Sequence, residues 1–374
     1  MVKKLVCVLL VLCALPLWAF AAEEQVEISS PSAVLMHSSG QVLYEKDART
    51  PRFIASVTKV MTLLLVFEQI ESGALSMADR VTASAHAASM GGSQIWLEEG
   101  ESFTVEEMIK AVAIASANDC AVALAEHISG SEQAFVARMN ERARELGMEN
   151  TTFKNACGLD AEGHVSCAYD VALMGAALIR HQKIKEYSTT RQSSLRGGEM
   201  VLDNTNKMIG HFEGMTGLKT GYTQKAGYCL CASAEREGTE LIAVVLGGET
   251  SSKRNADIAA LLNWGFANYR TLTPTPDMPL MPVRVVLGQS DAVPVELEAS
   301  NGVLVQKGAK ITKTVTLQDS VKAPVGAGDR MGVLTLMQNG TVIAEIPIVA
   351  QCDVPRLGYG ALLSRILRYC CMKG

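Results

Sequence analysis

A serine and a lysine three residues apart, Ser56 and Lys59, form the most reactive pair in the sequence. At a helix start, positions i and i+3 lie on one face, one turn apart. A serine hydroxyl is a poor nucleophile until a partner takes its proton, and a lysine amine can do so only where burial or another cation lowers its pKa. The spacing predicts a serine nucleophile with a lysine base. A serine and a lysine at this spacing, without other motifs, are also common on ordinary helix surfaces.

A second motif, Ser116-Ala117-Asn118, carries polar groups that such a site needs. The Ser116 hydroxyl could relay a proton, and the Asn118 amide could hold both the lysine and an amide of a substrate. Taken alone, the tripeptide would suit a helix cap equally well, because it lies at a predicted helix end.

A third motif, Lys219-Thr220-Gly221, falls in the middle of a predicted strand. A lysine there would attract a carboxylate and lower the pKa of Lys59, and Thr220 would hydrogen-bond that carboxylate. Gly221 has no side chain to block the close approach of a peptide. The tripeptide is common by chance, so its meaning depends on the other two motifs.

The spacing of apolar residues predicts the elements that position these motifs. Gly73 ends the first helix, and Thr104 with Glu107 forms a capping box. Helices are predicted at 56–70, 104–115, 119–129, 132–146, 170–181 (with Asp170 as its cap) and 252–269. Strands are predicted at 32–36 and 41–44 as a hairpin, and at 218–222, 228–234 and 240–246 as antiparallel neighbours. The expected fold is α+β, an antiparallel sheet flanked by helices with a helical subdomain.

Prolines at 274, 276, 279 and 282 mark a linker, because proline suits neither a helix interior nor a central strand. Beyond it, short alternating segments at 283–287, 313–317, 331–337 and 341–347 predict a small all-β domain. We expect a catalytic domain at 22–272, the β domain at 273–352 and an amphipathic helix at 353–374.

Both ends of the chain predict export and attachment to the outer side of a membrane. Lys3 and Lys4 precede an apolar run that ends near Ala21, which indicates a signal peptide over residues 1–21. The run is too short and too interrupted for an anchor helix. In the last segment, apolar residues and arginines fall on opposite helical faces, which predicts a helix on an anionic membrane surface. A helix docked on its own domain is the alternative.

Composition and residue spacing exclude some classes of ligand and partner. A net charge of -5 provides no basic excess for nucleic acid. The cysteine and histidine spacing lacks metal-ligand intervals, so we expect neither a metal nor another cofactor. Most cysteines are expected to be free and packed as small apolar side chains.

The three motifs together, in this order and in these contexts, resemble those of the penicillin-binding proteins and serine β-lactamases. The flanking residues narrow the resemblance to the low-molecular-mass D-alanyl-D-alanine carboxypeptidases: Ile54 to Thr62, Ser116 to Asp119, Asn204 to Asn206, Gly217 to Tyr222 and Ala226 to Tyr228. The similarity extends over nearly all of the chain after the signal peptide. Cys120 and Cys229 depart from the usual pattern, but neither replaces a catalytic group.

The resemblance implies a role for each matching residue. Ser56 would be acylated by peptidoglycan stem peptides ending in D-Ala-D-Ala and by β-lactam antibiotics, with Lys59 as the base. Ser116 and Asn118 would assist catalysis. The carboxylate would bind Lys219 and Thr220, and the oxyanion would bind the backbone amides of Ser56 and Tyr222. Arg254 matches an arginine near the carboxylate site, although a surface helix arginine is an equal alternative.

Three other functions share the motifs. A β-lactamase of class A would need a glutamate in an ExxLN segment, and the matching region, 153–159, contains no glutamate. A D,D-endopeptidase would use the same motifs but usually lacks the β domain. A penicillin-binding sensor would acylate without turnover. The carboxypeptidase is the expectation.

Overall fold

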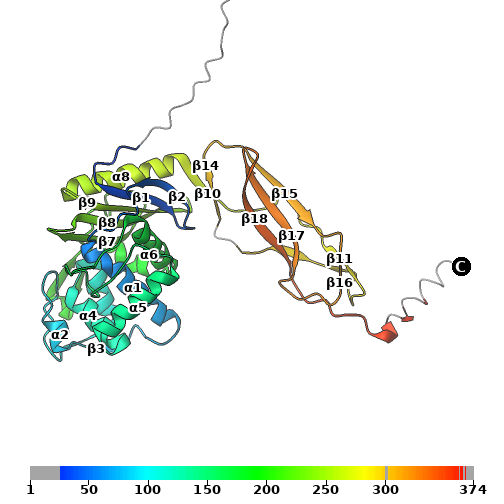
Figure 1. Cartoon of the computed structure of the whole chain (residues 1–374). Helices are drawn as coiled ribbons and strands as arrows, with labels where there is room; N and C mark the ends of the chain where they lie inside the picture. The colour runs from blue at the N-terminus through cyan, green and yellow to red at the C-terminus, as the bar shows by residue number, and fades with distance from the viewer. Residues whose placement is uncertain (1–25, 300–301, 362, 365–366, 368–374) are drawn as a thin grey trace, which may run out of the picture.

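The computed structural model describes residues 26–299, 302–361, 363–364 and 367. Two units follow one another along the chain: a larger helix-and-sheet unit up to residue 272 and a slender β unit from 273 to 356 (Figure 1). The predicted signal peptide lies outside the described residues, as do residues 362, 365–366 and 368–374 of the predicted C-terminal helix. The described part of that segment is helical only from residue 359, later than predicted, because Val354 and Arg356 form β-bridges with the second unit. No helix among the described residues is long and apolar enough to cross a bilayer.

A five-stranded antiparallel sheet forms the centre of the first unit. Its strands, in spatial order, are β2 (Val42–Lys46), β1 (Ser32–His37), β9 (Thr239–Gly248), β8 (Gly227–Arg236) and β7 (Met215–Thr223). The predicted hairpin and the three predicted antiparallel neighbours are all confirmed. β7 is an edge strand, so one side of its backbone is not paired within the sheet.

Both faces of this sheet are buried. Along β1, Ala33 and Leu35 join the core beneath α8 (Ser251–Asn268), whereas Val34 and Met36 join the core shared with the other helices. The alternation follows from the two-residue period of a strand. The helices on the second face include α1 (Lys59–Glu71) and α6 (Ala168–Arg180). The predicted α+β architecture is therefore confirmed, with α8 on one face and a helical layer on the other (Figure 1).

The helical layer contains several shorter elements. They are α2 (Ala85–Ala88), α3 (Val105–Lys110), a π-helical turn (Ala111–Ala115), α4 (Asn118–Ser129), α5 (Glu132–Glu145) and α7 (Ile184–Ser188). The predicted capping box is present, since the Thr104 hydroxyl accepts from the Glu107 N–H and the Glu107 carboxylate accepts from the Thr104 N–H. The pair β3 (Arg80–Thr82) with β4 (Ser102–Thr104) and the hairpin β5 (Gln192–Leu195) with β6 (Met200–Asp203) were not predicted.

Two local predictions are wrong. The helix expected from residue 56 begins at Lys59, and Ser56 lies instead in a preceding 3₁₀ turn, Ala55–Thr58. Asp170 does not cap α6: the Cys167 sulfur accepts the cap hydrogen bond, and the Asp170 carboxylate binds the Asn150 N–H at 2.8 Å. The carboxylate therefore ties a loop to the helix rather than ending the helix.

The second unit consists of short strands around its own apolar core, in which Leu334, Ile348 and Val293 are fully buried. Its strands are β11 (Val283–Val286), β12 (Ala292–Val293), β13 (Val295–Leu297), β14 (Val303–Gln306), β15 (Ile311–Leu317), β16 (Ser320–Lys322), β17 (Arg330–Gln338) and β18 (Thr341–Ala350). The four predicted segments are β11, β15, β17 and β18. Just before the proline-containing segment, β10 (Tyr269–Leu272) pairs with β14 and joins the two units.

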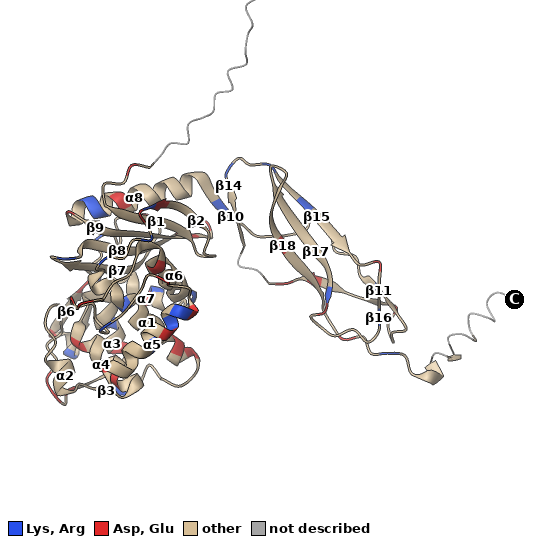
Figure 2. Cartoon of the chain, in the orientation of Figure 1, with Lys and Arg blue, Asp and Glu red and all other residues tan. Residues whose placement is uncertain are grey.

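The chemistry of the surface and of the cysteines agrees with the composition. Lys and Arg positions alternate with Asp and Glu positions along the ribbon of both units in the view of Figure 2. In the described part of the chain, Cys120, Cys157, Cys167, Cys229 and Cys231 are free and buried, as expected, and Cys352 is free and exposed.

Candidate active site

A cavity of about 570 Å³ opens between the β7 edge and the helical layer. Six of the nine predicted site residues line it: Ser56, Ser116, Thr220, Gly221, Tyr222 and Arg254. The other described residues along its wall are Ser93, Thr205, Lys207, Tyr228, Ser251, Ser252 and Asn255. Hydroxyl groups and cations dominate this wall, and none of these described lining residues is an Asp or a Glu. The cavity therefore suits an anionic, hydrogen-bonding ligand.

The turn that carries Ser56 is held by close backbone packing. Ala55 has a positive φ of 48°, an uncommon conformation for a residue with a side chain. A Cβ atom on Gly158 would lie 2.0 Å from the Ala55 carbonyl oxygen, and one on Gly221 would lie 3.1 Å from the Ser56 nitrogen. Glycine at 158 and 221 thus lets two segments press on the turn from different sides, and the backbone at Ser56 is fixed by both.

This packing predicts a strong effect of Gly158→Ala. The new methyl group would collide with the Ala55 carbonyl, and Gly158 also has a φ of +88°. We expect a loss of about 100-fold in the rate of penicillin acylation and about 2 kcal/mol in the free energy of unfolding. Acylation kinetics and urea unfolding check both.

Gly147→Ala is the matched control, since Gly147 has a φ of +75° and open space around it. It carries the same backbone strain without the collision. Equal acylation rates for the two variants would contradict the role given to Gly158.

Lys59 lies behind Ser56 and is fully buried. Its Nζ is 3.0 Å from the Ser56 Oγ, 2.5 Å from the Asn118 Oδ1 and 2.6 Å from the Cys157 carbonyl oxygen. A neutral amine has two N–H groups and one lone pair. The amide and the carbonyl accept both N–H groups, so the lone pair of the neutral form faces the Ser56 hydroxyl.

Burial also sets the charge of this amine. Desolvation lowers the pKa of Lys59 from 10.5 to about 8, while the Cys157 and Asp119 side chains oppose the shift. About a tenth of the molecules then carry a neutral amine at pH 7. Lys59 can therefore act as a base near neutral pH.

The Ser116 motif lies where the helical layer changes direction. The π-helical turn ends at Ser116, whose φ is 69°, and α4 begins at Asn118. The Asn118 side chain accepts from Lys59 and donates through Nδ2 to the Gly91 carbonyl at 2.6 Å. Asn118 thereby fixes the lysine, and Ser116 lines the cavity beside it.

The third motif lies along β7. Lys219 is buried, and its pKa is lowered well below the ordinary value by desolvation and, less strongly, by the charges of Lys59 and Arg254. The Thr220 hydroxyl donates to the Thr205 Oγ at 2.8 Å and lines the cavity. Lys219 and Lys59 are both fully buried amines, and the charge of Lys59 is one of the causes that lower the pKa of Lys219.

Arg254 is a buried residue of α8 rather than a surface one. Only 5% of it is exposed, and its guanidinium donates to the Cys229 carbonyl at 3.4 Å and to the Asn255 Oδ1 at 2.8 Å. No carboxylate of the described residues forms an ion pair with it. A buried, unpaired guanidinium on the cavity wall is suited to an anionic ligand.

His164 is a buried residue that supports the nucleophile turn and that the sequence did not reveal. Its Nε2 lies 2.7 Å from the hydroxyl of Thr58, the residue before the lysine, and its Nδ1 accepts from the Lys154 N–H at 3.1 Å. Because Nδ1 accepts, the ring is neutral and donates through Nε2. Burial lowers the pKa of His164 to about 4, which keeps it in this form.

The lowered pKa predicts a dependence of stability on pH. Between pH 6.5 and about 4, the unfolded chain binds a proton at His164 and the folded chain does not. Stability should therefore fall by about 3 kcal/mol as the pH falls through this range. Urea unfolding of His164→Gln should not show this fall in stability between pH 6.5 and about 4. The control His127→Gln, at an exposed histidine, should still show it. Identical pH profiles for the two variants would contradict the role given to His164.

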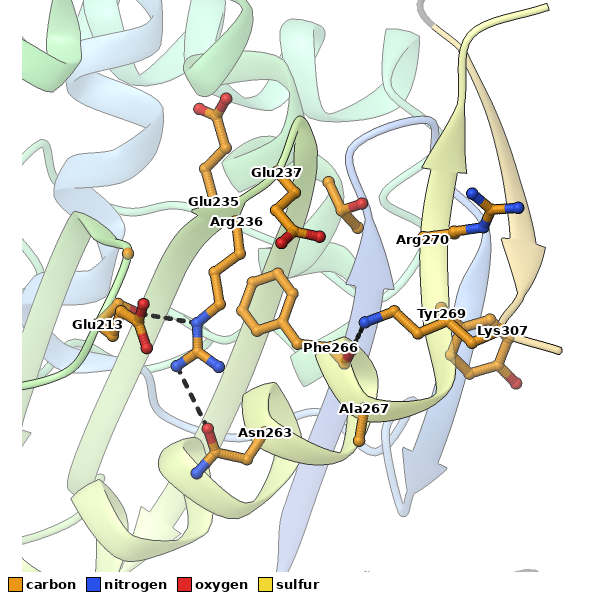
Figure 3. A pocket seen from close by; sticks show the side chains of 12 residues that line it. Glu213, Glu235, Arg236, Glu237, Asn263, Phe266, Ala267, Tyr269, Arg270 and Lys307 are labelled. Atoms are coloured by element: carbon orange, nitrogen blue, oxygen red, sulfur yellow. Dashed lines mark hydrogen bonds between the residues drawn. The ribbon is translucent and has the colours of Figure 1, made fainter.

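A second cavity, of about 520 Å³, lies near the junction of the two units (Figure 3). Arg236 donates to the Glu213 carbonyl and to the Asn263 side chain, and Lys307 donates to the Phe266 carbonyl (Figure 3). Its charged groups therefore serve the packing of α8 against the neighbouring strands. It lacks a serine and an amine in contact, so the catalytic chemistry belongs to the first cavity.

Comparison with known proteins agrees with this geometry. Residues 19–250 match the family model described as D-alanyl-D-alanine carboxypeptidase, and residues 276–356 match that of the penicillin-binding protein 5 C-terminal domain. The chain is 41% identical to D-alanyl-D-alanine carboxypeptidase DacF of Bacillus subtilis, over 90% of this chain and 88% of the relative.

Solved structures give the same result. Penicillin-binding protein 5 of Haemophilus influenzae is similar with a TM-score of 0.74 and 29% identity, over 88% of this chain and 98% of that one. Penicillin-binding protein D2 of Listeria monocytogenes, in its ampicillin-bound form, is similar with a TM-score of 0.59 and 32% identity, over 65% of this chain and 99% of that one. With its motifs in one cavity and its sequence matched along both units, the chain belongs to the D-alanyl-D-alanine carboxypeptidase family.

Proposed function

We propose that this chain hydrolyses the terminal D-Ala-D-Ala bond of peptidoglycan stem peptides through an acyl-enzyme on Ser56. The observation that carries the proposal is the position of Lys59, whose Nζ lies 3.0 Å from the Ser56 Oγ with its remaining hydrogen-bonding groups engaged. A base within hydrogen-bond distance of a serine, itself oriented by other groups, is the arrangement that activates a hydroxyl nucleophile.

In the acylation step, neutral Lys59 takes the Ser56 proton while the Oγ attacks the carbonyl carbon of the penultimate D-alanine. The backbone N–H groups of Ser56 and Tyr222 stabilise the oxyanion, each contributing about 3 kcal/mol. The proton then passes to the nitrogen of the leaving D-alanine, with Ser116 as a relay. Water hydrolyses the ester by the same route in reverse and restores the free serine.

The carboxylate of the substrate is bound by Lys219, Thr220 and Arg254. Desolvation favours the neutral form of Lys219 in the empty site, whereas an arriving carboxylate favours its charged form. The carboxylate and the protonated Lys219 then form an ion pair with no net charge. The substrate is therefore held without adding a net positive charge beside Lys59.

The free edge of β7 supplies the remaining contacts. Gly221 and Tyr222 lie on this edge beside the nucleophile turn, and an extended peptide can pair with their backbone groups as an added strand. Such pairing explains how a short peptide with small side chains is held firmly enough for reaction.

Acylation by β-lactams follows from the same contacts, since these compounds also present a strained amide and a carboxylate. The similarity to penicillin-binding protein D2 in its ampicillin-bound form supports this part of the proposal. D-alanine leaves the site after acylation, whereas the amine released when a β-lactam ring opens stays attached to the acyl group and obstructs the attack of water on the ester. The ester with penicillin should therefore be long-lived.

We further propose that the chain is exported and acts on the outer side of the membrane. Residues 1–21 would be the removed signal peptide, 22–272 the catalytic domain and 273–352 a β domain that holds it away from the bilayer. Residues 353–374 would bind the anionic surface through their basic and apolar residues. Flotation of the full chain with anionic and neutral vesicles tests the attachment.

Release of D-alanine from a stem pentapeptide tests the activity. The wild-type chain should release one D-alanine per peptide, and Ser56→Ala should release none above background. Undiminished release by Ser56→Ala, or no release by the folded wild type, would refute the proposed reaction.

A further inference from the structure

Large exposed apolar side chains of the first unit lie on segments that border the active-site cavity. Among the described residues up to 272, they are Trp96, Leu159, Val201 and Tyr222. Tyr222 lines the cavity, Leu159 follows the glycine that presses on the nucleophile turn, and Val201 belongs to the hairpin that leads to Thr205. Trp96 is the largest of them and 65% of it is exposed.

Trp96 belongs to a loop, residues 91–97, that touches the catalytic residues directly. The Asn118 N–H donates to the Ser93 carbonyl at 2.7 Å, and the Asn118 side chain donates to the Gly91 carbonyl at 2.6 Å. Ser93 itself lines the cavity. Three residues of chain reach at most about 10 Å, so the Trp96 backbone lies within about 10 Å of Ser93, although Trp96 is not itself one of the lining residues.

The loop is fixed by two charged side chains. The buried Asp119 carboxylate accepts from the N–H groups of Ile95 at 3.0 Å and Leu97 at 3.1 Å. The Arg196 guanidinium donates to the carbonyl oxygens of Ile95 at 2.9 Å and Trp96 at 3.2 Å. Two hydrogen bonds to the Glu101 carboxylate hold the guanidinium in place. The residues on both sides of Trp96 are buried, which forces the indole outward.

The conformation of Trp96 is itself costly. Its φ is +55°, which is an outlier for a bulky residue and persists only where the surroundings impose it. With the Gln94 amide turned so that its oxygen faces the ring, the indole N–H donates to it at 3.1 Å. Hydrogen bonds to Asn118, Asp119 and Arg196 therefore hold an unfavourable backbone conformation that presents an aromatic face to solvent.

The position of the Trp96 ring suits contact with the acyl portion of the substrate. The carboxylate-binding residues Thr220 and Arg254 come from the sheet side of the cavity, whereas Ser93 comes from the helical side. A peptide paired along the β7 edge has Ser93 and its loop on the opposite wall of the cavity, within reach of its acyl portion. Glu98 and Glu99 follow on the same loop, are exposed and form no ion pair among the described residues. An exposed indole followed two and three residues later by exposed carboxylates suits an alkyl chain that ends in an ammonium group.

We propose that Trp96 is a specificity-determining residue that binds the aliphatic, amine-ended side chain of the residue before D-Ala-D-Ala. The inference rests on the proposed carboxypeptidase function, and it names the part of the stem peptide that this site selects. Glu98 and Glu99 add attraction for the ammonium group.

Two peptides test it: N-acetyl-L-Lys-D-Ala-D-Ala and N-acetyl-L-Ala-D-Ala-D-Ala, with D-alanine release measured for each. The wild type should prefer the lysine peptide by about tenfold in kcat/KM, mainly through KM. Trp96→Ala should abolish this preference and leave the alanine peptide and penicillin acylation within about twofold of wild type. Trp96→Phe should keep most of the preference, and the double variant Glu98→Gln with Glu99→Gln should lower it in part.

Tyr359→Ala, which removes an exposed aromatic ring far along the chain, is the matched control and should leave the preference unchanged. An unchanged preference in Trp96→Ala, or an equal loss for both peptides and for penicillin, would overturn the inference. Release of D-alanine from the alanine peptide tests the carboxypeptidase function independently of Trp96. If the wild type released none from either peptide, the proposed function itself would have failed.

Discussion

Replacing Lys59 by methionine should lower the rate of Ser56 acylation by about 10³-fold or more, because the hydroxyl would lose its base. Methionine has a similar length and suits a buried position, so the chain should still fold. Lys59→Arg should be equally inactive, since a guanidinium stays protonated and has no lone pair to offer. Stopped-flow measurement with a chromogenic β-lactam gives the rates.

The pH dependence of the wild type provides a second readout. With a Lys59 pKa of about 8, kcat/KM should rise nearly tenfold per pH unit up to about pH 8 and then level off. Lys110→Met, on the surface of α3, is the matched control and should retain the wild-type rate and profile. Activity of Lys59→Arg within tenfold of wild type would show that another group is the base.

Replacing Lys219 by alanine should lower kcat/KM for a peptide with a free carboxylate by about 10²- to 10³-fold. Truncating one partner of a buried charge pair costs 2–5 kcal/mol, since the other charge is left without its partner. A peptide amidated at its C-terminus lacks that charge, so its much slower reaction should change by less than about fivefold. The ratio of the two substrates isolates the effect on carboxylate recognition.

Lys225→Ala is the control for this change, because Lys225 is an exposed lysine in the turn of the same β7–β8 hairpin. It should leave both substrates unaffected. An equal loss for the free and amidated peptides in Lys219→Ala would instead assign this lysine to the packing of β7 or to the base.

The sequence was sufficient to predict the contacts that are local in the chain. Ser56 and Lys59 face one another because they are three residues apart, and this holds in a 3₁₀ turn as well as in an α-helix, since the former has three residues per turn. The strands of the central sheet were equally visible, because β-branched residues and glycines mark them. The conclusion that the three motifs meet came from the resemblance to the family, not from their spacing.

What the sequence did not reveal depends on contacts between distant residues or on backbone groups. The Cys157 carbonyl that holds Lys59 lies 98 positions away, and a backbone oxygen leaves no mark in residue type. His164 was one of several scattered histidines until its contact with Thr58 was known. The β5–β6 hairpin was missed because its residues, from Gln192 to Asp203, have no clear apolar period.

The packing around Gly221 gives a different reason for glycine at this predicted site position. Gly221 was expected to make room for a substrate, yet the space that a side chain would need there is occupied by the chain's own turn, with the Ile54 carbonyl 2.7 Å from the Cβ position. Residue type alone predicted that glycine is needed, and only the neighbouring backbone explains why.

Covalent labelling of Ser56 is the most direct test of the central claim that this hydroxyl is the nucleophile activated by Lys59. The folded full chain should be incubated with a labelled penicillin, digested and analysed by mass spectrometry. One adduct is expected, on the peptide that contains Ser56, and it should be absent from Ser56→Ala. An adduct on a different residue, or no adduct on a protein whose fold is verified by circular dichroism, would contradict it.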